Sequence, residues 1–196
     1  MFYRILRGTL RFLLAILNGN AHYENRDKLP TDTSYILVAP HRTWIDPVYL
    51  AIAASPKPFT FMAKKELFKS AFMRFLAHLY GIFSVDRSGK DIEAIKTSLK
   101  ILKNGEVLGI FPEGTRNGLE KNGDVKNGAA YMAIKTGKPV IPVGIKGNFK
   151  PFTKVIVTYG KPIDFTEYQT KDKAQEKENL EKVSDIIMDN IISLTK

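Results

Sequence analysis

The stretch SYILVAPHRTWIDPVYLAIAA, residues 34–54, predicts a strand, a polar turn and the start of a helix in one run. Residues 34–39 form a continuous apolar segment, which is typical of a strand buried on both faces of an α/β sheet. Asp46 followed by Pro47 is typical of a helix N-cap and first helical position. This stretch therefore predicts one strand–turn–helix unit of a layered α/β fold.

The same alternation continues along the chain. We predict further strands over 59–63, 82–85, 106–111, 139–145 and 154–160, and further helices over 65–80, 88–103, 125–137 and 172–194. Strands that alternate with helices are joined mostly by right-handed crossovers. The predicted fold class is a single layered α/β domain over residues 30–196, with a mostly parallel central sheet flanked by helices.

His41 and Asp46 lie five positions apart in the polar turn. On an ideal helix they would point about 140° apart, and on a strand they would lie on opposite faces. They can meet only if the chain turns between them. If they meet, the carboxylate would orient an imidazole suited to take a proton from a hydroxyl group. The local pattern is equally consistent with Asp46 acting as a helix cap, and one turn can serve both purposes.

Two other predicted strand ends carry arginine. Arg87 follows strand 82–85, and PEGTR, residues 112–116, follows strand 106–111. Sites in α/β sheets form where loops leave the carboxyl ends of strands, and arginine binds phosphate well. Taken singly, such arginines are also consistent with surface ion pairs. Together the three loops indicate attack by an alcohol that is assisted by a base and anchored by its phosphate.

The composition and the absence of several motifs exclude some classes of reaction and binding site. The chain has no cysteine, which excludes disulfides, cysteine-ligated metals and a cysteine nucleophile. We find no G-x-S-x-G, H-E-x-x-H, G-x-G-x-x-G or Walker motif, and we expect no metal site. A formal charge of +10 favours polyanionic partners, although a basic surface also aids solubility. Nucleic-acid binding would favour basic residues interleaved with aromatics on one element, or a known module; the basic stretch AKKELFK is short, so we expect no nucleic-acid partner.

Residues 1–20 predict an N-terminal amphipathic helix. Arg4, Arg7 and Arg11 form a narrow cationic stripe on a largely apolar helix. Residues 2–17 would measure about 24 Å, which is shorter than the ~30 Å hydrocarbon core of a bilayer. We therefore expect a helix that lies in the interface of an anionic membrane. A helix packed on the domain's own core would also need an apolar face.

Four short motifs resemble those of a known family. HRTWIDP resembles the H-x4-D motif of the glycerolipid acyltransferases, and GIFSVDR, FPEGTR and VIPVGI resemble their second, third and fourth motifs, in the same order. The resemblance covers about residues 30–163 and is greatest to the bacterial 1-acylglycerol-3-phosphate (lysophosphatidate) acyltransferases. The first motif departs from the usual pattern, because Pro40 and Thr43 stand where the family commonly has asparagine and serine.

The resemblance implies transfer of a fatty acyl group from a thioester to the 2-hydroxyl of lysophosphatidate, giving phosphatidate. His41 would be the general base and Asp46 its partner. The residues implied to hold the glycerol phosphate are Arg87, Glu113, Gly114, Thr115 and Arg116. No acyl-enzyme and no cofactor are expected. The acyl donor would be a co-substrate, acyl-coenzyme A or acyl carrier protein.

The implied partners are lysophosphatidate, the acyl thioester donor and an anionic membrane surface. The implied location is the cytoplasmic face of the cell membrane, as a peripheral or monotopic protein. Two alternatives stay open. One keeps the chemistry but uses another glycerolipid or lysophospholipid as acceptor. The other is a non-catalytic lipid-binding protein of the membrane surface.

Overall fold

The computed structural model describes residues 21–43, 46–53, 59–71, 74, 77, 82–85, 92–112, 127–147 and 154–196. The predicted N-terminal helix, residues 1–20, lies outside these ranges. The proposed phosphate-binding residues, Arg87 and 113–116, also lie outside them. The fold can therefore be compared with the prediction over the sheet, its main helices and the His41 turn.

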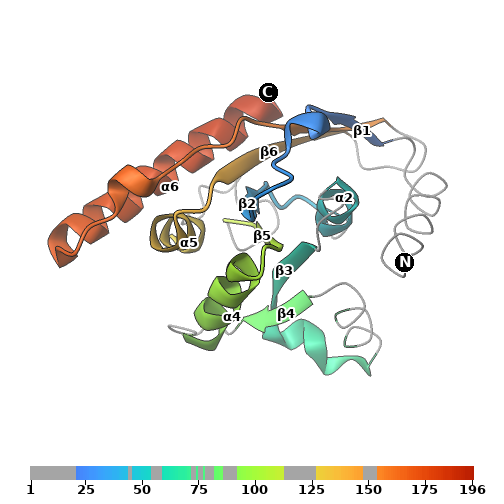
Figure 1. Cartoon of the computed structure of the whole chain (residues 1–196). Helices are drawn as coiled ribbons and strands as arrows, with labels where there is room; N and C mark the ends of the chain where they lie inside the picture. The colour runs from blue at the N-terminus through green and yellow to red at the C-terminus, as the bar shows by residue number, and fades with distance from the viewer. Residues whose placement is uncertain are drawn as a thin grey trace.

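A seven-stranded sheet forms the centre of the molecule (Figure 1). Its strands are β1 (Ala21–Glu24), β2 (Tyr35–Val38), β3 (Phe59–Lys64), β4 (Ile82–Val85), β5 (Val107–Ile110), β6 (Val140–Gly147) and β7 (Val155–Tyr159). The strand order is β1-β7-β6-β2-β5-β3-β4. Every neighbouring pair is parallel except β6 and β7, which are antiparallel. The predicted fold class, an α/β domain with a mostly parallel sheet, is confirmed.

Helices cover both faces of this sheet. The α-helices with complete bounds are α2 (Asp46–Ala53), α4 (Ile92–Lys103), α5 (Gly128–Thr136) and α6 (Lys173–Thr195), and the 3-10 helices are η1 (Arg26–Lys28), η2 (Lys65–Lys69) and η3 (Thr166–Tyr168). Figure 1 shows α4, α5 and α6 on one face and α2 on the other. Predicted stops are also confirmed, because Gly105 and Gly137 follow α4 and α5 with φ of 81° and 60°.

Strand β2 is buried on both sides, as its apolar sequence predicts. Leu37 packs in the core cluster that includes Leu50 of α2. Ile36 and Val38 point the other way, into the cluster formed with α4, α5 and α6. Successive side chains of a strand alternate between faces, so a strand covered on both faces needs apolar residues throughout. This burial places the end of β2, and the polar turn after it, in the middle of the sheet.

The predicted helix over 65–80 is wrong in its first turn. The chain there forms the 3-10 helix η2 (Lys65–Lys69), and residues 71 and 74 are in helical conformation. The guanidinium of Arg74 donates to the carbonyl oxygens of Phe68 and Lys69 at 3.1 and 3.0 Å. A side chain therefore satisfies carbonyl groups that a continuous α-helix would bond through its own amides.

Strand β1 is absent from the elements predicted from the sequence. The structure pairs His22 with Ile156 in parallel register, and Thr158 donates to Glu24 across the two strands at 2.8 Å. A four-residue strand has too short a pattern to recognise, and its partner β7 lies far along the chain. The sheet therefore begins before residue 30.

Tyr159 ends β7 as a buried residue, 1% exposed, whose hydroxyl has no hydrogen-bond partner among the described residues. Burial, with added repulsion from Tyr23 and Tyr35, raises the pKa of Tyr159 well above 10.0. Tyr159→Phe should therefore stabilise the fold by about 1 kcal/mol at neutral pH, because it removes an unsatisfied hydroxyl. Urea unfolding checks this, with Tyr131→Phe on α5 as the control.

The gain from Tyr159→Phe should grow in alkali. The unfolded chain releases the phenol proton near pH 10.0, whereas the folded protein retains it because the pKa of Tyr159 is raised. Wild-type stability from this group is thus complete below pH 10 and declines as the pH rises above it. Equal stability of the two proteins at both neutral and alkaline pH would contradict the prediction.

Candidate active site

The candidate site begins where two central parallel strands end side by side. Val38 of β2 pairs with Ile110 of β5, and the amide of Ala39 donates to the carbonyl of Ile110 at 3.3 Å. His41 follows β2, and Phe111 is the first residue after β5. The carboxyl ends of parallel strands meet at one edge of a sheet, so these two residues emerge next to each other.

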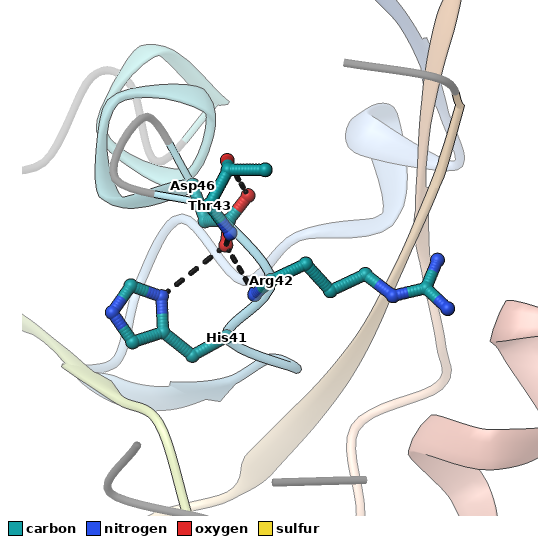
Figure 2. Close-up of polar contacts among 4 residues, drawn as sticks. All are labelled: His41, Arg42, Thr43 and Asp46. Carbon is teal, nitrogen blue, oxygen red and sulfur yellow. Dashed lines mark hydrogen bonds and ion pairs between the residues drawn. The ribbon is translucent and has the colours of Figure 1, made fainter. Parts of the chain in front are cut away.

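The carboxylate of Asp46 organises the turn after β2 (Figure 2). Its Oδ2 accepts from the amides of Arg42 and Thr43, both at 2.6 Å, and lies 3.2 Å from Nδ1 of His41. Its Oδ1 accepts from the hydroxyl of Thr43 at 2.7 Å. Asp46 is 0% exposed, and these donors compensate for the burial of its charge. The chain therefore turns between His41 and Asp46, and the two side chains make contact.

These contacts distinguish Asp46 from an ordinary helix cap. At the start of α6, Asp172 accepts from Ala174 and Gln175, the amides that follow it. Asp46 is the first residue of α2, yet the bonds described for it come from residues 41–43, which precede it. Its negative charge also lies at the favourable N-terminal end of the helix. Asp46 thus ties the turn to the helix and orients the imidazole.

The contact with Asp46 fixes which nitrogen of His41 carries the proton. An ionised carboxylate only accepts hydrogen bonds, so Nδ1 of His41 is the protonated nitrogen. In the neutral imidazole, Nε2 then holds a lone pair and is free to accept a proton. The His41 side chain is 19% exposed, whereas Asp46 is fully buried. The pair therefore presents one basic nitrogen at the edge of the sheet.

The ring of Phe111 stacks on the imidazole of His41. The ring centroids lie 4.5 Å apart and the planes meet at 29°. The next residue, Pro112, is buried. Phe111 belongs to the FPEGTR motif, but the sequence alone does not predict its contact with His41.

The described residues cover only part of the predicted site. Arg87, Glu113, Gly114, Thr115 and Arg116 lie outside them, so their roles stay predictions. The catalytic roles of His41 and Asp46 also stay predictions, although their contact is observed.

Sequence reasoning missed the Thr43 hydroxyl, which bonds the carboxylate of Asp46. The spacing Thr-x-x-Asp carried a signal, because it is the spacing of a hydroxyl–carboxylate pair near a helix start.

Two further properties concern only the described part of the chain. No three His, Asp or Glu side chains there lie close enough to hold a metal ion. Among the same residues, no helix is both long and apolar enough to span a bilayer.

Comparisons with known proteins show which family this chain resembles. The sequence model of the acyltransferase family matches residues 20–146. The chain is 44% identical over 177 residues to a 1-acyl-sn-glycerol-3-phosphate acyltransferase of Streptococcus pneumoniae, over 85% of this chain. The match spans 64% of that relative, slightly less than two thirds of its length. A Bacillus subtilis protein of the same name is 31% identical over 180 residues, covering 87% of this chain and 88% of its own.

A solved structure shares the fold. The 1-acyl-sn-glycerophosphate (LPA) acyltransferase PlsC from Thermotoga maritima superposes with a TM-score of 0.69 at 22% sequence identity. The superposition covers 98% of this chain and 79% of the Thermotoga chain. At this identity the likeness concerns the fold alone.

Proposed function

The chain belongs to the acyltransferase family, and from this membership we propose that it acylates the 2-hydroxyl of 1-acylglycerol-3-phosphate to give phosphatidate. The acyl donor is a thioester of coenzyme A or of acyl carrier protein. The names of the Streptococcus and Bacillus relatives support this acceptor. The assignment of the acyl donor rests on the family resemblance alone, and no cofactor is proposed.

The observation that carries the proposal is the His41–Asp46 pair, with Nδ1 held at 3.2 Å from the carboxylate. Nε2 accepts the proton of the acceptor hydroxyl as its oxygen attacks the thioester carbonyl. The new C–O bond forms, the C–S bond breaks, and the imidazolium returns its proton to the leaving thiolate. Asp46 stabilises the imidazolium that forms in between. No acyl-enzyme is needed in this sequence.

The phosphate of the acceptor is assigned to the loops that follow β4 and β5 in the sequence. We propose that it is held by Arg87 and by the residues of the third motif, Glu113, Gly114, Thr115 and Arg116. Arginine pairs with phosphate through two parallel hydrogen bonds, and glycine permits close approach of the backbone. An alcohol held by its phosphate at this edge would have its hydroxyl near His41.

The protein is proposed to work at the cytoplasmic face of the cell membrane. Its substrate carries a fatty chain, and its formal charge of +10 favours an anionic lipid surface. Residues 1–20 are proposed to anchor it, because their arginine stripe and apolar face suit a membrane interface.

An acceptor and donor competition tests the function. Purified full-length protein is supplied with acyl-coenzyme A or acyl carrier protein, and with lysophosphatidate, glycerol-3-phosphate or an uncharged monoacylglycerol. We expect phosphatidate from lysophosphatidate to be the fastest product, because only this acceptor combines the phosphate and the acyl chain. Faster acylation of another acceptor would contradict the assigned substrate. Binding to anionic vesicles without turnover on any acceptor would instead indicate a lipid-binding protein.

A further inference from the structure

Phe111 contacts the proposed base directly, yet nothing in its motif assigns it a task. We infer that Phe111 is a positioning residue, which fixes the plane of the His41 imidazole so that Nε2 faces the acceptor hydroxyl. The inference rests on the proposed function, because it concerns the same base. The observation behind it is the stack of the two rings, 4.5 Å between centroids and 29° between planes.

The carboxylate alone holds the imidazole loosely. Oδ2 of Asp46 accepts from the amides of Arg42 and Thr43 at 2.6 Å, but Nδ1 of His41 lies at 3.2 Å. The last distance is at the long end for a hydrogen bond, and longer than is usual for a charge-assisted one. Rotation about the second side-chain torsion of histidine is also soft. A second constraint on the ring plane is therefore needed, and Phe111 lies where it can supply it.

Rigid elements hold Phe111 itself. The pairing of Val38 with Ile110 joins β5 to the strand that leads into His41. The buried Pro112 restricts the backbone of the residue before it to extended conformations. The Phe111 side chain is partly buried against the core cluster that contains Leu37. A ring fixed in this way can restrict rotation of the imidazole beside it. Phe111 directly follows a packed strand, and side chains held by rigid elements are positioned more precisely than those on free loops.

The stack and the carboxylate together determine which atom of the imidazole takes the proton. Asp46 lies against Nδ1 and Phe111 covers one face of the ring, so Nε2 is the basic atom left for the acceptor. The aromatic face also favours the positive charge that the imidazole gains when it takes a proton. Both effects act on the chemical step and not on the binding of lysophosphatidate or of the thioester.

Phe111→Leu tests the inference, because leucine keeps apolar volume but removes the ring. We expect kcat to fall about three- to tenfold, the usual strength of an aromatic pair, with both KM values unchanged. Phe111→Tyr keeps the ring and should restore most of the rate. The His41 ring protons should show an upfield NMR shift in wild type and in Phe111→Tyr, and lose it in Phe111→Leu. The chain has only three histidines, so the signal is assigned with His41→Ala.

Phe165→Leu is the matched control, since the ring of Phe165 also packs against an aromatic ring, that of Tyr168, but in the opposite core cluster. It should leave kcat and the His41 signals unchanged. Wild-type kcat in Phe111→Leu, or Phe111→Tyr no better than Phe111→Leu, would overturn the inference while leaving acyl transfer intact. Absence of acyl transfer by the wild-type protein would overturn the proposed function instead. The NMR shift would still report whether Phe111 orients the ring.

Discussion

Replacing His41 by alanine should lower kcat for acyl transfer by about 10²–10⁴-fold while the protein stays folded. Nε2 of His41 is the basic atom that the turn presents, because Nδ1 is held by the buried Asp46. Without it, the acceptor hydroxyl must attack while still protonated, and the barrier rises by about 3–5 kcal/mol. Initial rates of phosphatidate formation, with circular dichroism to confirm folding, measure the effect.

His22→Ala is the matched control for this substitution. His22 is an exposed residue on the edge strand β1, three strands away from β2 in the sheet order. His22→Ala therefore removes an imidazole that does not belong to the turn after β2. The control should retain the wild-type rate. An equal loss in both variants would show that the rate reports folding or membrane binding, and that His41 has no special task.

Asp46→Asn should have the second largest effect, lowering kcat by about 10²–10³-fold. Asparagine keeps one oxygen, but its amide group is a donor and would face donors from the turn. The two amides and the Thr43 hydroxyl would compete for that oxygen, and Nδ1 of His41 would lose its partner. An unsatisfied buried group should also lower the free energy of unfolding by about 1–3 kcal/mol.

The control for Asp46→Asn is Asp172→Asn at the start of α6. The side-chain bonds described for Asp172 come from the amides that follow it, and asparagine caps helices equally well. This variant should keep both the rate and the stability of the wild type. If Asp46→Asn lost stability but kept the wild-type kcat, Asp46 would serve the turn alone and not the base.

Much of the sheet could be predicted because the apolar sequences of its inner strands indicate that these strands are buried. Residues 35–39, 107–111 and 139–145 are apolar throughout, and all three stretches form inner strands whose side chains are buried on both faces of the sheet. Helix ends at Gly105 and Gly137 were also visible, because glycine adopts positive φ readily. In these elements the local pattern and the tertiary environment agree.

Two other elements, β1 and η2, could not be predicted, because contacts with residues outside each element determine their conformation. β1 is a strand through its register with β7, which follows more than a hundred residues later in the chain. η2 departs from the predicted helix where Arg74 bonds the carbonyls of Phe68 and Lys69. Neither contact leaves a periodic signal in the sequence around it.

In the candidate site, too, some features could be predicted from the sequence and others required the structure. The spacing of His41 and Asp46 indicated a turn, and the structure contains one, with the carboxylate against the imidazole. The contacts of Thr43 and Phe111 depend on side-chain direction and on the β2–β5 register, which spacing cannot supply. The residues proposed to bind phosphate lie outside the described ranges, so their placement stays a prediction, as do the catalytic roles of His41 and Asp46.

The account depends most on His41 taking the proton of the acceptor hydroxyl. The single-turnover rate of phosphatidate formation tests this directly, because it isolates the chemical step from product release and membrane exchange. With enzyme in excess over the acyl thioester and with saturating lysophosphatidate, His41→Ala should be slower than His22→Ala by at least about a hundredfold. Equal single-turnover rates for these two folded variants would contradict the account.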